Sequence, residues 1–196
     1  MEKINFIKTF IPQGDFREKY EHGGMMVRHL AAVLDEKMGA YECYECTVPI
    51  GEYDEGEIQK AFVEFSARMD ALKLKQAKAD KIAEITAYDT SSSVNGFMLN
   101  GLLVWLDKAT RVGLMNSTTI AKASGQKTTT LWLVGLKLVV DCDKAIQLLS
   151  ALEMYALECF NVTASHKQAV SELTTIEEVE VFDVTADYPQ QLVMKL

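Results

Sequence analysis

The sequence lacks any apolar run that approaches the ~20 residues needed to span a bilayer, and it therefore predicts no membrane helix. The first residues, Met1 to Phe6, carry an acid and show neither an apolar signal core nor a cleavage pattern, so we expect no secretion through a signal peptide. Basic residues are also in the minority, because the net charge is −8. Nucleic-acid binding usually needs a basic face that neutralises phosphates. These absences predict partners other than membranes and nucleic acids.

Recognisable catalytic and metal-binding motifs are missing as well. Cys43 and Cys46 have no second pair of ligands at zinc-site spacing, and an alternating strand would place the two thiols on opposite faces. The histidines, His22, His29 and His166, form no His-Glu-x-x-His arrangement, and His166 falls on an apolar helix face where a core or interface histidine is expected. No Gly-x-Ser-x-Gly elbow and no phosphate-binding glycine loop occurs. We predict a protein that is not an enzyme, without catalytic residues, metal site or cofactor, and with cysteines that are free thiols.

The composition is that of an ordinary globular protein, with 48% hydrophobic and 24% charged residues. A chain of 196 residues forms one domain or two small ones. Residues 1–54 predict a β-rich region, because the alternating run 40–48 follows the apolar run 27–34 across a glycine turn, as in a β-hairpin. A helix through residues 28–35 fits part of the same pattern, and this alternative stays open.

The clearest signal is a helix over residues 55–87, which contain no proline and, after Gly56, no glycine. Positions along it recur at alternating steps of four and three, the heptad spacing of a helix that packs on another helix. These positions are Ile58, Phe62, Phe65, Met69, Leu72, Gln76, Ala79 and Ala83. The helix either lies on its own domain or packs on a copy of itself, and the pattern weakens toward its end. We predict that the first five, here called the seam, face inward together and form the interface of a homodimer or homotrimer.

Residues 88–196 predict a C-terminal α+β domain that begins after a polar break at 88–94. The chain then repeats itself weakly as strand, glycine turn, strand and helix, over residues 96–123 and again over 131–160. The first unit contains Asn100–Gly101, a strong signal for a tight hairpin turn. The overall expectation is an α+β protein in which the long helix links an N-terminal β-hairpin region to a domain of β-hairpins and helices.

Two aspartates stand where the helices of this repeat begin. We expect Asp107 and Asp143 each to accept a hydrogen bond from an unpaired amide at the start of its helix, and superposed units to bring the two aspartates together. Gly125 is the expected terminator of the first helix. The second helix, from Lys144 onward, is either one long helix or two with a break near Asn161. Further on, a threonine-to-glutamate spacing predicts a capping box that opens a short final helix.

Two segments carry a resemblance to a known family. One runs from Tyr88-Asp89 through Asn95-Gly96-Phe97 to Val104-Trp105-Leu106-Asp107-Lys108-Ala109-Thr110-Arg111. The other runs from Thr175-Ile176-Glu177-Glu178-Val179 to Phe182-Asp183-Val184-Thr185-Ala186-Asp187-Tyr188-Pro189. Over about residues 80–192 the chain resembles an uncharacterised domain encoded in the tail regions of phages and prophages, especially of gut Bacteroides and their relatives, often beside tail-fibre and tail-assembly proteins.

The resemblance implies a phage or prophage structural or assembly protein: a virion tail or fibre component, or a chaperone for fibre assembly. Its partners would be itself and other virion proteins, and it would reside in the virion or the cytoplasm of the bacterial host. Trp105, Asp107 and Arg111 match the family pattern, and we expect Trp105 to fill the core under the hairpin and Arg111 to bond to backbone or to an acid. The pattern leads us to expect glycine where Asp187 stands. The alternative is a small acidic regulatory protein that binds a basic host target, and an enzyme is a more distant third.

Overall fold

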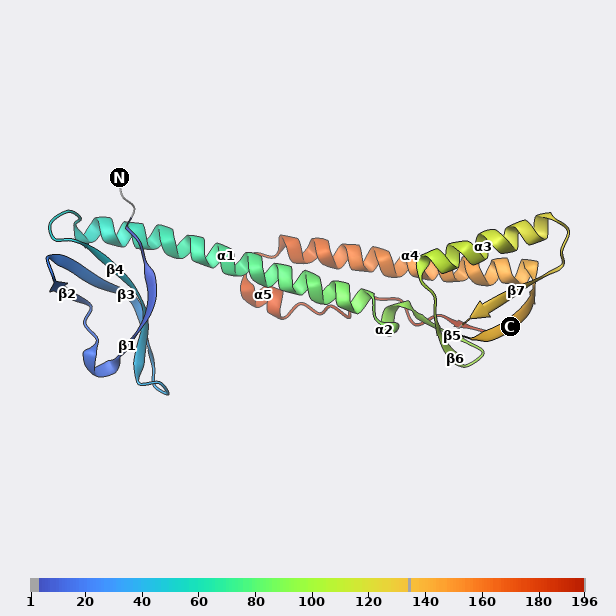
Figure 1. Cartoon of the computed structure of the whole chain (residues 1–196), viewed down its shortest axis with the longest axis horizontal. Helices are drawn as coiled ribbons and strands as arrows, with labels where there is room; N and C mark the ends of the chain where they lie inside the picture. The colour runs from blue at the N-terminus through green and yellow to red at the C-terminus, as the bar shows by residue number, and fades with distance from the viewer. Residues whose placement is uncertain (1–3, 134, 196) are drawn as a thin grey trace. The chain divides into compact units, whose positions relative to one another are not determined.

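The computed structural model describes residues 4–133 and 135–195 and confirms the α+β class (Figure 1). The chain separates into two compact units, Met1–Lys73 and Leu74–Leu196, here called the N-terminal unit and the C-terminal unit. The division falls inside helix α1 (Glu55–Asp89), whereas the sequence analysis placed its boundaries at residues 54 and 87. Within the described part of the chain, no helix has the length and apolar character required to cross a membrane.

The N-terminal unit contains an antiparallel sheet in the strand order β1-β4-β3-β2. Its elements are β1 (Ile7–Pro12), the 3₁₀ turn η1 (Gln13–Asp15), β2 (Lys19–His22), β3 (Met25–Asp35), β4 (Ala40–Pro49) and the first half of α1. Strands β3 and β4 form the hairpin expected from the sequence, so the alternative of a helix over residues 28–35 is wrong. A bulge between Leu30 and Val33 interrupts their pairing, and Ala31 adopts a left-handed conformation there, with φ 51°.

Helix α1 begins with a reciprocal cap against one edge of this sheet. The Glu57 amide donates to the Asp54 carboxylate at 2.8 Å, and the Asp54 amide donates to the Glu57 carboxylate at 2.9 Å. Glu55, which follows Asp54, accepts side-chain hydrogen bonds from Lys19 of β2 at 2.5 Å and from Arg28 of β3 at 3.0 Å. The hydrogen bond from Lys19 is the largest cause that holds the pKa of Glu55 below its ordinary value. These contacts join the start of the helix to two strands.

Both faces of the sheet are covered by other parts of the N-terminal unit. Helix α1 packs on one face, where the buried residues are Met26, Leu30, Cys46, Val48, Ile58 and Phe62. On the other face Phe16 stacks on Tyr41, with ring centroids 4.2 Å apart, and His29 Nδ1 donates to the backbone carbonyl of Arg17. Cys43, an odd number of residues from Cys46 along β4, is buried outside the cluster that contains Cys46. The four cysteines are free thiols.

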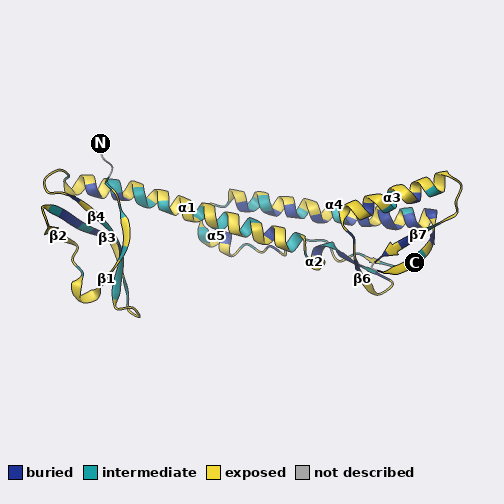
Figure 2. Ribbon diagram, in the orientation of Figure 1, coloured by how far each residue is buried: buried dark blue, intermediate teal, exposed yellow. Residues whose placement is uncertain are grey.

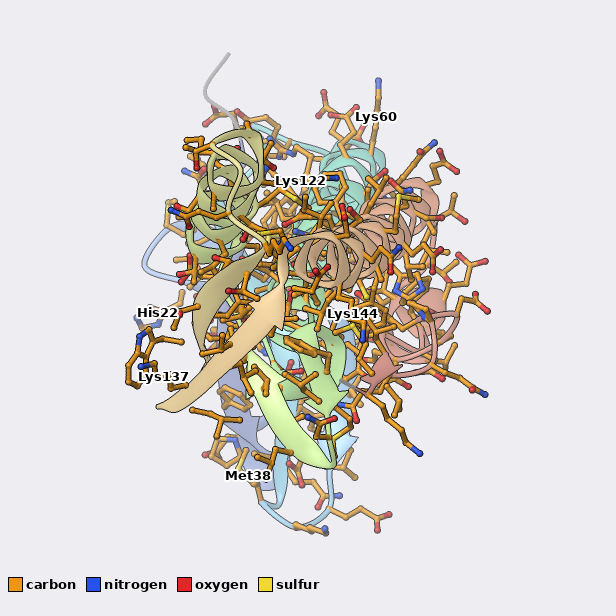
Figure 3. The ribbon with its side chains drawn as sticks, turned by 90° about the vertical axis from the view of Figure 1, so that its right-hand side faces the viewer. His22, Met38, Lys60, Lys122, Lys137 and Lys144 are labelled. Carbon is orange, nitrogen blue, oxygen red and sulfur yellow. The ribbon has the colours of Figure 1, made fainter. Side chains whose placement is uncertain are left out.

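The C-terminal unit consists of helices over two hairpins. Its remaining elements are α2 (Ser92–Asn95), β5 (Gly96–Leu99), β6 (Leu102–Trp105), α3 (Lys108–Ala123), β7 (Thr128–Leu133), β8 (Leu136–Asp141), α4 (Cys142–Glu172), α5 (Ile176–Glu180) and β9 (Val193–Met194). Strands β6, β5 and β9 form one sheet and β7 with β8 forms another. The inward side chains of both hairpins, among them Phe97 and Leu131, pack in one cluster with Leu149 of α4. Figures 1 and 3 show the hairpins lying side by side beneath α3 and α4.

The buried face of α1 changes along the helix. Gln76, Ala79 and Ala83, which continue the spacing of the seam, are exposed in the C-terminal unit. The positions of α1 that are buried or half-buried there are Leu74, Ala77, Lys78, Lys81, Ile82, Ile85, Tyr88 and Asp89. Ile85 is fully buried with Val170 and Val184. Figure 2 shows the exposed colour dominating the middle of the helix. The eight-position pattern read from the sequence is therefore wrong beyond Leu72, because a second apolar series begins at Leu74.

Two lysines of α1 supply positive charge to the ends of other helices. Lys78 donates to the carbonyl of Ser171 in the last turn of α4 at 2.7 Å, and Lys81 donates to the carbonyl of Glu180 at the end of α5 at 3.5 Å. Neither α4 nor α5 has a basic residue in its own last turn. Cations stabilise the negative end of a helix dipole. The two lysines of α1 therefore supply the positive charge that the last turns of α4 and α5 lack.

The two hairpin-and-helix units occur in the expected order, but only one of the two expected caps is right. Asp107 caps α3 by accepting from the Thr110 amide at 2.8 Å. The cap of α4 is Asp141, which accepts from the amide of Asp143 at 2.9 Å, so Asp143 lies in the first turn of the helix instead. The last turn of α3 ends as expected, with Gly125 at φ 85°. Helix α4 is one unbroken helix, which removes the alternative of a break near Asn161.

The chain leaves α5 through a turn that contains a strained residue. Thr175 and Glu178 form the expected capping box at the start of α5. Downstream, Asp183 accepts hydrogen bonds from the amide and hydroxyl of Thr185 at 2.8 and 2.7 Å. Asp187, where the family pattern led us to expect glycine, has φ 59°, in the left-handed region that glycine adopts without a steric cost.

We predict that Asp187→Gly stabilises the C-terminal unit by roughly 0.5–1 kcal/mol, since the left-handed conformation costs a residue with a Cβ about 1–2 kcal/mol and aspartate recovers only part of that cost. Ala186→Gly is the matched control, because the φ angle of Ala186 is not positive. There the greater freedom of glycine in the unfolded chain should lower the stability of the unit by a similar amount. Urea unfolding of both variants measures the difference. A lower midpoint for Asp187→Gly than for the unmodified protein would contradict the strain.

Candidate functional site

The seam is divided between core and surface. Ile58 is fully buried and Phe62 is buried, whereas Phe65 and Met69 are half-buried. The last residue, Leu72, is 59% exposed. The prediction that all five face inward together is therefore right for the first half of the seam and wrong for Leu72. The sheet of the N-terminal unit buries Ile58 and Phe62 and still contacts Phe65 through Tyr44 of β4, whereas Leu72 lies beyond its cover.

A shallow apolar groove runs along the uncovered part of the seam. It has a volume of about 330 Å³, and its walls come from the segment before β1 and from α1. The lining residues are Ile4, Asn5, Phe6, Phe65, Arg68, Met69 and Leu72. Phe6 forms its base, with its ring centroid 5.1 Å from that of Phe65. The contribution of Phe6 was not predictable from the sequence, since no local pattern connects Phe6 with a helix that begins almost fifty residues later.

Trp105 does not fill the core as the sequence analysis expected. It is 51% exposed, and Val104 is the buried residue at this end of β6. The reason is the alternation of side chains along a strand: Val104 pairs with Phe97, and both face the core, so Trp105 and Leu103 point to the opposite face. Leu103 is 53% exposed. The exposed face of this hairpin therefore carries two large apolar side chains next to each other.

Arg111 has the structural role that was expected of it. The side chain is buried, its Nε donates to Glu153 of α4 at 2.8 Å, and its Nη1 donates to the backbone carbonyl of Leu106 at 2.7 Å. The guanidinium thus joins the end of β6, the first turn of α3 and the middle of α4. Asp107 lies one helical turn earlier, at the cap of α3, and the side-chain hydrogen bond from Thr110 is the largest cause that lowers the pKa of Asp107.

A pocket of about 340 Å³ lies beside this guanidinium. It is lined by Asp89, Asn95, Lys108, Arg111, Glu153, Ala156, Leu157, Cys159 and Phe160. Its charged groups are balanced, and Arg111 and Glu153 are already bonded to each other. On the same helix, α4, the Tyr155 hydroxyl donates to the carbonyl of Val94 at 2.8 Å, and burial raises the pKa of Tyr155 to about 12. Burial also raises the pKa of the Cys159 thiol, which keeps it protonated and a poor nucleophile.

His166 is buried, as expected for a core histidine, and its ring lies edge-on to Phe182 and Tyr188. Nearby, the Thr163 hydroxyl donates to Asp89 at 2.7 Å and is also 2.7 Å from the Tyr188 hydroxyl. In the parts of the chain that the structure describes, no group of three or more His, Cys, Asp or Glu side chains is placed to hold a metal ion.

We predict that Arg111→Met destabilises the C-terminal unit by roughly 2–3 kcal/mol, because it leaves the Leu106 carbonyl and the Glu153 carboxylate without their partner. Lys122→Met is the matched control. It removes an ion pair between Lys122 of α3 and Asp143 of α4 whose side chains are exposed, and its cost should stay below about 1 kcal/mol. Chemical denaturation followed by circular dichroism measures both. Equal losses for the two variants would contradict the role given to Arg111.

Comparison with known proteins places the C-terminal unit in a family. A model described as a domain of unknown function, DUF4376, matches residues 76–186. No curated protein and no solved structure matches the chain. The matched segment begins in the second half of α1, contains both hairpins, α3, α4 and α5, and includes Trp105, Asp107 and Arg111. It covers more than half of the chain, and the chain therefore belongs to the DUF4376 family.

Proposed function

We propose that this protein is a structural or assembly component of a phage or prophage tail region, and that it works by associating with copies of itself and with other virion proteins. The two sequence patterns that resemble tail-region domains support the setting. The observation that carries the mode of action is the uncovered end of the seam, where Met69 and Leu72 border an apolar groove.

The first half of the seam cannot serve as the interface, since its side chains already stabilise the N-terminal unit. Ile58 and Phe62 belong to the core, and the Phe65 ring lies 5.2 Å from that of Tyr44 on β4. The proposed interface is therefore smaller than the five residues suggested by the sequence. It consists of the groove and the exposed turns at Met69 and Leu72.

A second copy of α1 fits this groove because it presents the same residues at the same spacing. Two helices that carry an apolar position every 3.5 residues on average keep those positions in contact along their length. Charge does not oppose the contact, although the whole chain has a net charge of −8. Asp70 and Lys73 flank Leu72 with opposite charges 3.6 Å apart, and Arg68 adds a further positive charge at the rim of the groove.

We predict that Leu72→Lys weakens self-association, whereas Val63→Lys does not. The two residues are equally exposed on α1, at 59% and 58%, but Val63 lies off the seam. The substitution removes the burial of the Leu72 side chain on association, which contributes about 1.5 kcal/mol or more in each copy. The dissociation constant should therefore rise at least about tenfold. Light scattering over a concentration series measures the assembly. Phe65 is unsuitable for this test, because its substitution would disturb the core.

An unmodified protein that stays monomeric at every concentration would contradict the proposed interface, as would equal effects of the two lysine substitutions. The setting is tested separately by mass spectrometry of purified phage particles and of infected or induced cells. A tail component is enriched in particles at a fixed copy number. Detection in cells at the time of assembly, without enrichment in particles, supports an assembly factor, and detection only in early infection favours an acidic regulator instead.

A further inference from the structure

The outer edge of β6 is an exposed strand edge made of large apolar residues. In the sheet order β6-β5-β9, β6 has a neighbour on one side only, and among the described residues no strand pairs with its other side (Figure 1). It contains no charged residue and no proline. Strand edges in natural proteins are usually protected from further pairing by such residues, by bulges or by a covering element.

The other outer strands in the described part of the chain carry such protection, and β9 at the far edge of the same sheet is only two residues long. β1 contains Lys8 and ends at Pro12, and β2 contains Lys19 and Glu21. β8 contains Lys137, which points away from α3 and α4 (Figure 3). The uncharged strand β7 lies in contact with α3, and the Lys137 ammonium is 6.0 Å from the ring centroid of its exposed Trp132. Because β6 lacks each of these features, it is the edge best suited to accept another strand.

The hydrogen bonds of β5 show which backbone groups of β6 are unpaired. The amides of Met98 and Asn100 donate toward the β9 side, to Leu192 and Met194, at 2.8 and 3.0 Å. In a strand, successive amides point to opposite sides, so Phe97 and Leu99 direct their backbone groups toward β6. Their partners in the register are Val104 and Leu102. The N–H and C=O groups of Leu103 and Trp105 consequently point away from the sheet.

We propose that this edge of β6 pairs antiparallel with β6 of a second copy of the chain, in the register that places Val104 opposite Val104. In that register Leu103 of each copy stands opposite Trp105 of the other. Residues opposite each other in such positions exchange both of their backbone hydrogen bonds. Every outward N–H and C=O group of β6 is then paired, and no other symmetric register within the strand achieves this.

The side chains agree with the same register. Leu103 and Trp105 lie on one face of the sheet, and both are more than half exposed. Across the symmetric pairing, the leucine of one copy comes to lie beside the tryptophan of the other on both sides of the axis, and such aliphatic–aromatic neighbours stabilise antiparallel strands. Because β6 is uncharged, the net charge of −8 brings no like charges into opposition within the paired strands.

This contact is independent of the groove on α1, since it uses residues of the C-terminal unit alone. It goes beyond the proposed function, which names self-association only through the seam. The pairing is small, and small contacts are typically weak and dependent on concentration. Such a contact serves a protein that is held at high local concentration in an assembly.

Residue-resolved hydrogen exchange of the full chain tests the pairing. The amides of Leu102 and Val104 face β5 and should be protected at every concentration, which also reports that the hairpin is folded. The amides of Leu103 and Trp105 should exchange freely in dilute protein and become protected as the concentration rises. In a sample of mixed isotope labelling, a contact between the Val104 Hα atoms of two copies should appear, because Cα atoms approach to about 4.5 Å in such a pair.

Trp105→Lys should abolish the concentration-dependent protection of Leu103, and Trp132→Lys, which changes another exposed tryptophan of the same unit, should leave it intact. Leu72→Lys should also leave it intact, so that failure of the groove and failure of the edge can be told apart. The proposal is overturned if the amides of Leu103 and Trp105 remain unprotected at every concentration. Protection that does not depend on concentration, or that Trp132→Lys removes equally, overturns it as well.

Discussion

The fold depends on one helix whose buried face changes partway along its length. In the N-terminal unit α1 is held by Ile58 and Phe62, and in the C-terminal unit by Ile85, each packed into the core of its own unit. The change falls between Leu72 and Leu74, at the same place as the division between the units. Each unit therefore buries only the part of α1 that packs into its own core. The turns on either side of the change lack a full cover, and the exposed end of the seam is a direct consequence.

The sequence predicts the helix but not this change of face. Leu72 continues the heptad series from Ile58, and Leu74 opens a second series that leads to Ile85, so both leucines fit an apolar stripe of a helix. Periodicity alone cannot decide between them, because each stripe is defined by what packs on it. The hairpin of β3 with β4, the α3 cap at Asp107 and the unbroken α4 depended on local signals and were predictable. The groove base at Phe6 required contacts between distant segments and was not.

Two misplaced residues show how finely local signals must be read. Asp141 precedes α4 and Asp143 lies in its first turn. Only at Asp141 does the backbone geometry leave the carboxylate within reach of the first amides of the helix. Trp105 was assigned to the core because of its size, yet the tight turn before β6 sets the alternation that turns Val104 inward. An exposed tryptophan on an uncharged strand edge is unfavourable for a monomer. It becomes favourable where another strand covers it, which connects the local alternation with the proposed association.

We propose that the exposed residues of α1 and β6 are contact surfaces, whereas the buried ones maintain two separate cores. The most direct measurement of this division is the accessibility of leucine and isoleucine methyl groups to a soluble paramagnetic agent, recorded by NMR across a dilution series. Ile58 and Ile85 should stay inaccessible at every concentration, and Leu72 should be accessible in dilute protein and become shielded as the concentration rises. An accessible Ile85, or a Leu72 equally shielded at all dilutions, would contradict the account.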